Sequence, residues 1–457
     1  MTNRLQEIVS EHAERIGVPG VAAGVYLDGT EEYAFHGVTS VENPLPVDEN
    51  TLFQFGSTGK TFTSTAIMRL VEAGKIDLHA PVRRYVPELV LADESTAEAV
   101  TVLNLLNHTA GWSGDYLGSA QDMGDDALAN YVTQMATLPQ EYPLGAGVSY
   151  NNASLSLAGR VIEKVTGQRF EDAIAELILR PLGMDHSYFF LTDIMTRRFV
   201  VGHTKGDDGA FTVARPWAMP RSGAPAGGIT ANAGDQVAWI RFHLGDGTAP
   251  DGTRLLTRET LEQMKQPTVD MVGSAIGDHV GISWLIEDVD GVRLVGHGGS
   301  TIGQQSAFQM VPERKFGIAV LTNADAGSDL NHAVVRAALK EYIGVVQSDP
   351  EPTKRETAAL AEFAGDYDTI AMSLKLTVGE DGWLMADSQP KPEFLAQLGA
   401  NAEDFASPPM PLGMTTPDGD GFVIVEGPGQ GMKGYFARDD AGKISAVHLG
   451  GRLATRI

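Results

Sequence analysis

The most informative segment of this chain, residues 53–63, reads Phe53-Gln54-Phe55-Gly56-Ser57-Thr58-Gly59-Lys60-Thr61-Phe62-Thr63. Ser57 and Lys60 are three positions apart, so on a helix their side chains lie on one face, one turn apart. A serine hydroxyl becomes a nucleophile when a neighbouring base removes its proton. A lysine amine can be that base when burial lowers its pKa. The segment therefore predicts a Ser–Lys pair at the start of a helix.

The flanking residues place this pair at a junction between a strand and a helix. Leu52 to Phe55 is an apolar segment typical of a strand, and Gly74 ends the helix that follows. Backbone N–H groups and the helix dipole favour negative charge at such a junction. The spacing alone also fits an ordinary helix start, with Ser57 as N-cap and Lys60 solvated. The apolar residues at helical spacing are Phe62, Ala66, Ile67, Leu70 and Val71.

Two other motifs overlap the segment and both fail at one position. Gly59-Lys60-Thr61 resembles the end of a phosphate-binding P-loop, but Gln54 stands where that motif needs its first glycine. The nucleophile elbow G-x-S-x-G fails because Phe55 occupies its first glycine position.

Composition indicates a globular protein of two or three domains, with 457 residues, 43% hydrophobic and 20% charged. The net charge of −25 argues against a nucleic-acid partner and against adsorption to anionic membranes. The chain has no cysteine, which excludes disulfides, thiolate nucleophiles and Cys-ligated zinc. Met1 to Gly17 is typical of an amphipathic helix and not of a signal peptide. We therefore expect a cytoplasmic protein, although a mature chain with a replaced leader has the same appearance.

The pattern along the chain predicts three regions. An N-terminal hairpin, 21–27 with 32–37, precedes the Ser57 helix, and helical segments dominate about 80–220. Strands are then expected at 279–286, 292–296, 304–311 and 316–322, followed by a helix over about 329–342. Residues 347–355 have the composition of a linker, and 356–457 carry short strands typical of a small all-β barrel.

A second candidate segment, Val148-Ser149-Tyr150-Asn151-Asn152-Ala153, precedes a predicted helix. Tyr150 can share a proton with the Ser57–Lys60 pair, and a nearby ammonium is expected to lower the pKa of its phenol. Asn152 can donate to a substrate carbonyl and contact Lys60. The same residues also fit a helix start capped by Asn152, with Tyr150 packed in the core.

A third segment, Val295-Gly296-His297-Gly298-Gly299-Ser300, ends a predicted strand. Glycines in a strand allow another backbone to approach closely, as a bound acyl group requires. The N–H groups of Ser300 and Ser57 can together form an oxyanion hole, in which each donor contributes ~3 kcal/mol. A glycine-rich hairpin is the alternative.

These three motifs resemble, in order and approximate spacing, those of the serine β-lactamase and penicillin-binding-protein superfamily. The form is similar to its class C branch, which includes family VIII esterases, D-aminopeptidases and penicillin-binding-type thioesterases. The resemblance covers roughly residues 5–345. Three further segments look like the family: Asn107-His108-Thr109-Ala110-Gly111, Pro181-Leu182-Gly183-Met184 and Pro225-Ala226-Gly227-Gly228.

The resemblance implies an α+β fold: an antiparallel sheet flanked by helices, with an all-α subdomain over about 80–220. It implies a domain over 1–346 and a lipocalin-like barrel after the linker. It also implies that Ser57 is acylated, that Lys60 and Tyr150 exchange protons, and that Asn152 orients the substrate carbonyl. The strand His297-Gly298-Gly299 binds substrate, and the N–H groups of Ser57 and Ser300 form the oxyanion hole. No cofactor is implied.

His297 departs from the K-T-G triad that many β-lactamases have at this position. Histidine is only partly charged at neutral pH, which favours esters, amides or peptides over β-lactams. His108 fits a structural role near the site, and neither His203 nor His243 has partners at metal-binding spacing, so no metal is expected. The aromatic residues Trp112, Tyr116 and Trp217 fit either an acyl pocket or simple packing.

Three functions share this chemistry. The leading expectation is a serine hydrolase acting on small esters, amides or peptides, including those of D-amino acids. The second is acyl transfer to an amine, as in a transpeptidase or a peptide cyclase. The third is a penicillin-binding sensing module that acylates without turnover. In each case the partner is a small-molecule or peptide acyl substrate.

Overall fold

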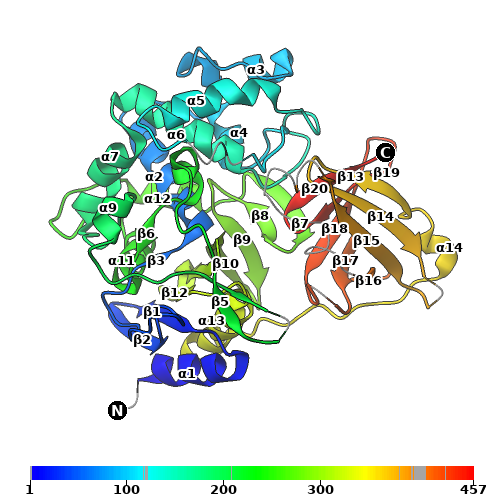
Figure 1. The fold of residues 1–457 in the computed structure, drawn as a ribbon. Coiled ribbons are helices and arrows are strands. Elements are labelled where there is room, and N and C mark those ends of the chain that lie inside the picture. Colours follow the sequence, from blue (N-terminus) through cyan, green and yellow to red (C-terminus); the bar gives the residue numbers. More distant parts are fainter. Residues whose placement is uncertain are drawn as a thin grey trace.

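A computed structural model describes residues 3–116, 118, 122–206, 208–379, 381–392, 395, 408–427 and 429–457. Its first part is built on an eight-stranded antiparallel sheet with the order β2-β1-β12-β11-β10-β9-β8-β7 (Figure 1). The N-terminal hairpin joins the strand of this sheet that comes last in sequence, because β1 pairs with β12 from Val21↔Thr322 to Leu27↔Phe316. The strands are β1 Gly20–Leu27, β2 Thr30–Gly37, β7 Val269–Ser274, β8 Gly277–Val280, β9 Leu285–Val289, β10 Val292–Thr301, β11 Gln304–Val311 and β12 Phe316–Thr322.

The sheet departs from the sequence prediction at residues 279–286. The single strand expected there is wrong, because β8 ends at Val280 and β9 begins at Leu285. Ser283 adopts a positive φ of 58°, which breaks the extended conformation between them. Gly281 packs closely on Met264, since a Cβ on this glycine would lie only 2.4 Å from the Met264 carbonyl oxygen. A side chain there would push the turn away from its neighbour.

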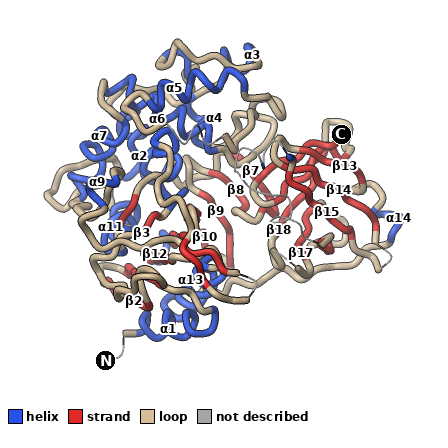
Figure 2. The backbone as a smooth tube through the Cα atoms, viewed as in Figure 1, coloured by secondary structure: helices blue, strands red, loops and turns tan. Residues whose placement is uncertain are grey.

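Helices cover both faces of this sheet (Figure 2). On one face α1 (Arg4–Ile16) and α13 (Gly327–Ile343) share an apolar core with the strands. On the other face lie α2 (Gly59–Glu72) and α11 (Ala233–Leu244). Helix α2 is buried along most of its length, so the residues at its start are held on all sides.

The region expected to be all-α is mainly helical but contains a two-stranded ribbon, so the all-α expectation is wrong there. Strand β4 (His203–Lys205) pairs with β5 (Phe211–Val213). Two short strands, β3 (Phe53–Gln54) and β6 (Thr230–Ala231), also pair next to the Ser57 turn. The helices of the remaining chain before the barrel are α3 Glu94–Ala99, α4 Val102–Leu106, α5 Ala127–Gln134, α6 Asn152–Thr166, α7 Phe170–Ile174, α8 Arg180–Leu182, α9 Leu191–Ile194, α10 Ala224–Gly227 and α12 Arg258–Met264, with a π-helical turn at Ala175–Leu179.

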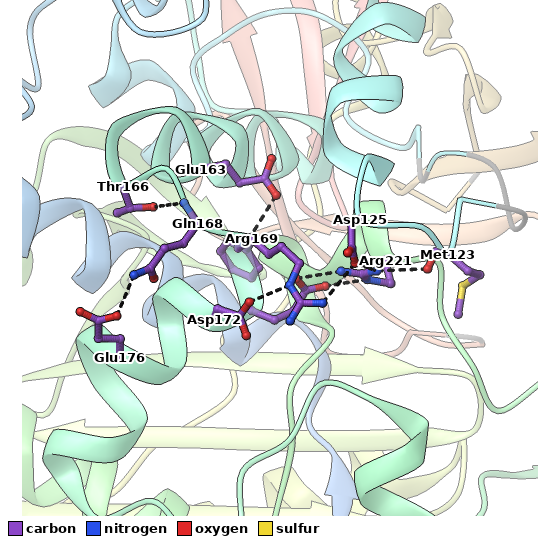
Figure 3. Close-up of polar contacts among 11 residues, drawn as sticks. Met123, Asp125, Glu163, Thr166, Gln168, Arg169, Asp172, Glu176 and Arg221 are labelled. Atoms are coloured by element: carbon purple, nitrogen blue, oxygen red, sulfur yellow. Dashed lines mark hydrogen bonds and ion pairs between the residues drawn. The ribbon is translucent and has the colours of Figure 1, made fainter.

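An ion-pair network fixes the segment that leads into α10 (Figure 3). Arg221 donates to Glu171 on α7 at 2.9 Å and to Asp125 at 2.8 Å. Arg169 joins the same network through Asp125 at 3.2 Å and Asp172 at 2.6 Å. The Glu171 side chain is only 6% exposed, so its ion pair with Arg221 is shielded from water. The network holds the chain three residues before α10 begins.

The C-terminal part is a closed antiparallel barrel, as the sequence predicted (Figure 1). Its interior is filled by apolar side chains, among them Phe363, Tyr367, Phe422 and Phe436. A short helix, α14 (Thr357–Leu360), precedes it. The barrel strands are β13 Gly365–Asp368, β14 Met372–Val378, β15 Leu384–Pro390, β16 Met410–Met414, β17 Gly421–Ile424, β18 Lys433–Arg438, β19 Ile444–Leu449 and β20 Arg452–Arg456. Among the helices of the described residues, none has the length and hydropathy required to cross a bilayer.

Candidate active site

Ser57 lies in a 3₁₀ turn, Gly56–Thr58, that leads directly into α2. The Thr58 hydroxyl donates to the carbonyl oxygen of His297 on β10 at 3.0 Å. The Ser306 hydroxyl on β11 donates to Phe55 O at 2.7 Å. Gly56 has a φ of +56°, and a Cβ there would lie 2.7 Å from the nitrogen of Ser300. These contacts hold Ser57 at a fixed position against β10.

Lys60 is fully buried at the start of α2, and its Nζ lies 2.9 Å from Ser57 Oγ. The same amine donates to the carbonyl oxygen of Ala226 on α10 at 2.7 Å. Burial, and then the positive charge of Arg452, holds the pKa of Lys60 well below its ordinary value. A neutral amine that gives one N–H to Ala226 can turn its lone pair toward Ser57.

Tyr150 lies beside this pair, with the centroid of its ring 4.8 Å from Lys60 Nζ. Burial raises the pKa of the Tyr150 phenol, while a hydrogen bond with Ser57 and the charge of Arg452 lower it in part. The prediction that a neighbouring ammonium lowers this pKa is therefore wrong. The desolvation of the phenolate outweighs the charges near it. The resting pair is a phenol beside a lysine with a lowered pKa.

Asn151, not Asn152, caps α6. The Asn151 side chain accepts the N–H of Ser154 at 2.8 Å and donates to Trp112 O at 2.8 Å. Asn152 is the first residue of the helix, and its side chain lines the cavity that also contains Ser57 and Tyr150. Within the described residues no hydrogen bond joins Asn152 to Lys60, whose amine bonds to Ser57 and Ala226 instead.

His297, Gly298, Gly299 and Ser300 form the end of β10 next to the Ser57 turn. A Cβ on Gly299 would lie 1.9 Å from Phe55 O and 2.9 Å from Ser57 N. Burial, and then the charge of Lys60, lowers the pKa of His297 to about 3. The imidazole is therefore neutral, and its Nε2 lies 3.5 Å from the Tyr150 hydroxyl.

His108 supports Tyr150 from the other side, as its expected structural role required. Its Nδ1 accepts the backbone N–H of Asn151 at 3.1 Å. Its ring centroid lies 4.5 Å from that of Tyr150. Burial, and then the charges of Lys60, His297 and Arg452, holds the pKa of His108 well below its usual range. A neutral His108 ring adds no charge beside the phenol.

A residue of the barrel also reaches this site, and the sequence did not indicate it. Arg452 begins β20, and its Cζ lies 5.0 Å from the centroid of the Tyr150 ring. Its Nε lies 3.0 Å from Asp115 Oδ2. Gly451 accepts the backbone N–H of Tyr150 at 2.8 Å. The barrel thus contributes a charged side chain and a backbone contact to the surroundings of Tyr150.

These residues surround a cavity of about 1270 Å³ between the sheet and the barrel. Its lining includes Ser57, Tyr150, Asn152, His297 to Ser300 and Arg452. It does not include the three aromatic residues considered for an acyl pocket. Trp112 is buried in the core, Tyr116 packs on Tyr131, and Trp217 lines a separate cavity of about 180 Å³.

The two histidines considered for a metal site, His203 and His243, take structural positions. His203 is buried, with Nδ1 2.7 Å from Asn323 O, and His243 is buried against Trp239 and Trp284. Among the described residues there is no group of His, Asp and Glu side chains that could hold a metal ion.

A protein-family comparison agrees with this geometry, since the family model described as Beta-lactamase matches residues 5–341. The chain belongs to the beta-lactamase family. The match includes Ser57, Tyr150 and His297 and ends before the barrel. This member of the beta-lactamase family therefore carries an eight-stranded barrel after the family domain.

Individual relatives extend the comparison over the whole chain. Penicillin-binding protein 4 of Amycolatopsis lactamdurans is 33% identical over 357 residues, which cover 77% of this chain and 93% of that protein. The crystal structure of SurE superposes with a TM-score of 0.79 at 26% identity, covering 99% of this chain and 98% of that one. The D-amino acid amidase from Ochrobactrum anthropi SV3, complexed with L-phenylalanine amide, has the same fold, with a TM-score of 0.60 at 24% identity. Its match covers 74% of this chain and 97% of that one.

Proposed function

We propose that the protein is a serine hydrolase that forms an acyl-enzyme on Ser57 and cleaves esters, amides or peptides, including those of D-amino acids. The observation that carries this proposal is the 2.9 Å contact between Lys60 Nζ and Ser57 Oγ. Lys60 is fully buried and its pKa is lowered, so a neutral amine is available next to the nucleophile.

In the acylation step, Ser57 Oγ attacks the substrate carbonyl carbon and its proton passes to Lys60 Nζ. The carbonyl oxygen gains negative charge and receives hydrogen bonds from the backbone N–H groups of Ser57 and Ser300. Each such donor stabilises the transition state by ~3 kcal/mol. Tyr150 then gives its phenolic proton to the leaving group and recovers a proton from Lys60. The bond to the leaving group breaks, and the acyl ester of Ser57 remains.

Deacylation repeats these transfers with a second nucleophile. Water loses a proton through Tyr150 to Lys60 and attacks the acyl carbon, and Ser57 regains its proton as the ester breaks. The high pKa of Tyr150 suits a relay that stays protonated between steps. Asn152 lines the cavity beside Ser57, which supports its role in orienting the substrate carbonyl.

Arg452 supports a preference for substrates that carry a polar group near the scissile bond. His297 is neutral and cannot supply the positive charge of the lysine in a K-T-G triad. Arg452 lines the same cavity, and its side chain is 30% exposed. Its charge is shared with Asp115, which disfavours strong binding of a free anion.

Acyl transfer to an amine is the second candidate, because the cavity of about 1270 Å³ has room for more than a small ester. An amine would replace water in the deacylation step, with the same proton transfers. The acyl group would then leave Ser57 as an amide.

Activated esters and anilides of N-acyl-D-amino acids test both candidates. Hydrolysis in the wild type that is lost in Ser57→Ala and reduced at least 100-fold in Lys60→Met is the result expected for the hydrolase. Amide products that replace the acid when an amine is added support transfer. Equal turnover by wild type and Ser57→Ala contradicts the proposal.

A further inference from the structure

Two side chains of β11 bind the chain just before Ser57. Ser306 Oγ donates to Phe55 O at 2.7 Å, and Gln304 Oε1 accepts the backbone N–H of Gln54 at 2.9 Å. Residues two positions apart on a strand point to the same face, so both side chains project toward the Ser57 turn. The segment that leads into Ser57 is therefore attached to β11 at two successive residues.

Gln304 and Gln54 form a buried pair of side-chain amides, 1% and 6% exposed. Gln304 Nε2 donates to Gln54 Oε1 at 3.3 Å, and Gln54 Nε2 donates to Trp217 O at 2.9 Å. Both the oxygen and the nitrogen of each amide thus have a hydrogen-bond partner. A buried polar network in which each member is bonded holds its residues in one arrangement. The pair is therefore a rigid link between β11 and the strand before Ser57.

Ser300 lies between the two points of attachment. In the ladder of β10 and β11 it is opposite the one residue that separates Gln304 from Ser306. A Cβ on Gly56 would lie 2.7 Å from both the N and the O of Ser300, so the Ser300 backbone faces the turn that contains Ser57. The distance between the two oxyanion donors, Ser57 N and Ser300 N, therefore depends on how firmly β11 holds the chain before Ser57.

The hairpin that contains Ser300 has supports that do not involve Gln304. Its tip is held by Gly303 O, which accepts the backbone N–H of His203 at 3.1 Å. Strand β11 also pairs with β12 along residues 305–311. Loss of the Gln304 amide should therefore loosen the segment before Ser57 and leave the hairpin folded.

We propose that Gln304 is a positioning residue of the catalytic site, which fixes the distance between the two backbone donors of the oxyanion hole through its hydrogen bonds to Gln54. This inference rests on the proposed function and adds a residue outside the substrate cavity to it. Gln304 is not among the residues that line that cavity, so its effect on the reaction passes through the backbone.

The test compares an activated ester with its thionoester, in which sulfur replaces the carbonyl oxygen. Sulfur is the weaker hydrogen-bond acceptor, so an intact oxyanion hole favours the oxygen ester. In Gln304→Met the side chain keeps nearly the same shape and forms neither hydrogen bond to Gln54. We expect the ratio of the two acylation rate constants, oxygen over sulfur, to fall about tenfold, which is part of the ~100-fold value of one complete donor. The substrate dissociation constant from single-turnover kinetics should change about twofold or less.

The matched control is Gln236→Met on α11. Gln236 is also 1% exposed, and its Nε2 has no hydrogen-bond partner among the described residues. Its rate ratio should equal that of the wild type. A variant that had only lost folded protein would slow both esters by the same factor and leave the ratio unchanged, which separates positioning from a general structural role.

Gln54→Met gives a graded second variant, because it keeps the backbone N–H that bonds to Gln304 and removes the amide–amide bond and the bond to Trp217 O. Its ratio should fall about threefold. This variant also decides the matter if Gln304→Met does not fold, since a wild-type ratio in Gln54→Met would then overturn the inference. A wild-type ratio in a folded Gln304→Met, or an equal fall in Gln236→Met, overturns it as well.

Failure of the proposed function is distinguishable, because the wild type would then acylate with neither ester. In that case hydrogen–deuterium exchange of the peptides that cover residues 54–57 and 299–304 still tests the link. Faster exchange in Gln304→Met than in the wild type and Gln236→Met supports it, and equal exchange in all three contradicts it.

Discussion

Gly299→Ala tests whether the close contact between β10 and the Ser57 turn is required for catalysis. The added Cβ would lie 1.9 Å from Phe55 O and 2.9 Å from Ser57 N, whereas ordinary contacts begin at 3.4 Å. Both neighbours are backbone atoms, so the strand and the turn must separate by ~1.5 Å. A displacement of about 1 Å in a catalytic site costs about 100-fold in rate. We therefore expect the rate of Ser57 modification by a fluorophosphonate to fall about 100-fold.

Gly298→Ala is the matched comparison on the same strand. Its added Cβ meets only Ser306 O, at 3.6 Å, which is an ordinary contact. The modification rate should fall about threefold or less, and the thermal unfolding midpoint should stay close to that of the wild type. The reasoning is refuted if Gly299→Ala reacts at the wild-type rate, or if both variants lose the same activity.

Further substitutions probe the electrostatics and the caps of the site. In Arg452→Gln the positive charge near Lys60 is lost and Asp115 is left unpaired, and both changes raise the pKa of Lys60. Because the rate falls as this amine becomes protonated, the acid limb of the kcat/KM profile should move to higher pH. An acid limb at the same pH as in the wild type contradicts the assignment of Lys60 as the base. Asn151→Ala removes the α6 cap and the bond to Trp112 O. It should lower the free energy of unfolding by about 1–3 kcal/mol in urea titrations, and a loss below that range would show that the cap contributes little.

The parts of the site that the sequence predicted are those set by local geometry. Ser57 and Lys60 are close because three residues span one helical turn, and this holds wherever the helix packs. The strand containing His297 and the barrel were also predictable, because alternating apolar residues and glycine-bounded strands carry a local signal. The order of the three motifs then indicated the family before any contact was known.

Long-range contacts were not predictable from local patterns. Ala226 accepts a hydrogen bond from Lys60 through its backbone, so its side chain gives no signal. Arg452 lies 302 positions from Tyr150 in sequence, and only the packing of the barrel brings the two together. The pKa of Tyr150 was predicted with the wrong sign because burial, which only the structure gives, outweighs the nearby charges.

The central claim is that Ser57 is the acylated nucleophile and that Lys60 activates it. Its most direct test is peptide-mapping mass spectrometry of the wild type, quenched in acid during turnover of an activated ester. The account predicts one acyl group per chain, on the peptide that contains Ser57, and no adduct in Ser57→Ala. An acyl group on another residue, or turnover without any covalent adduct on repeated rapid quenching, would contradict it.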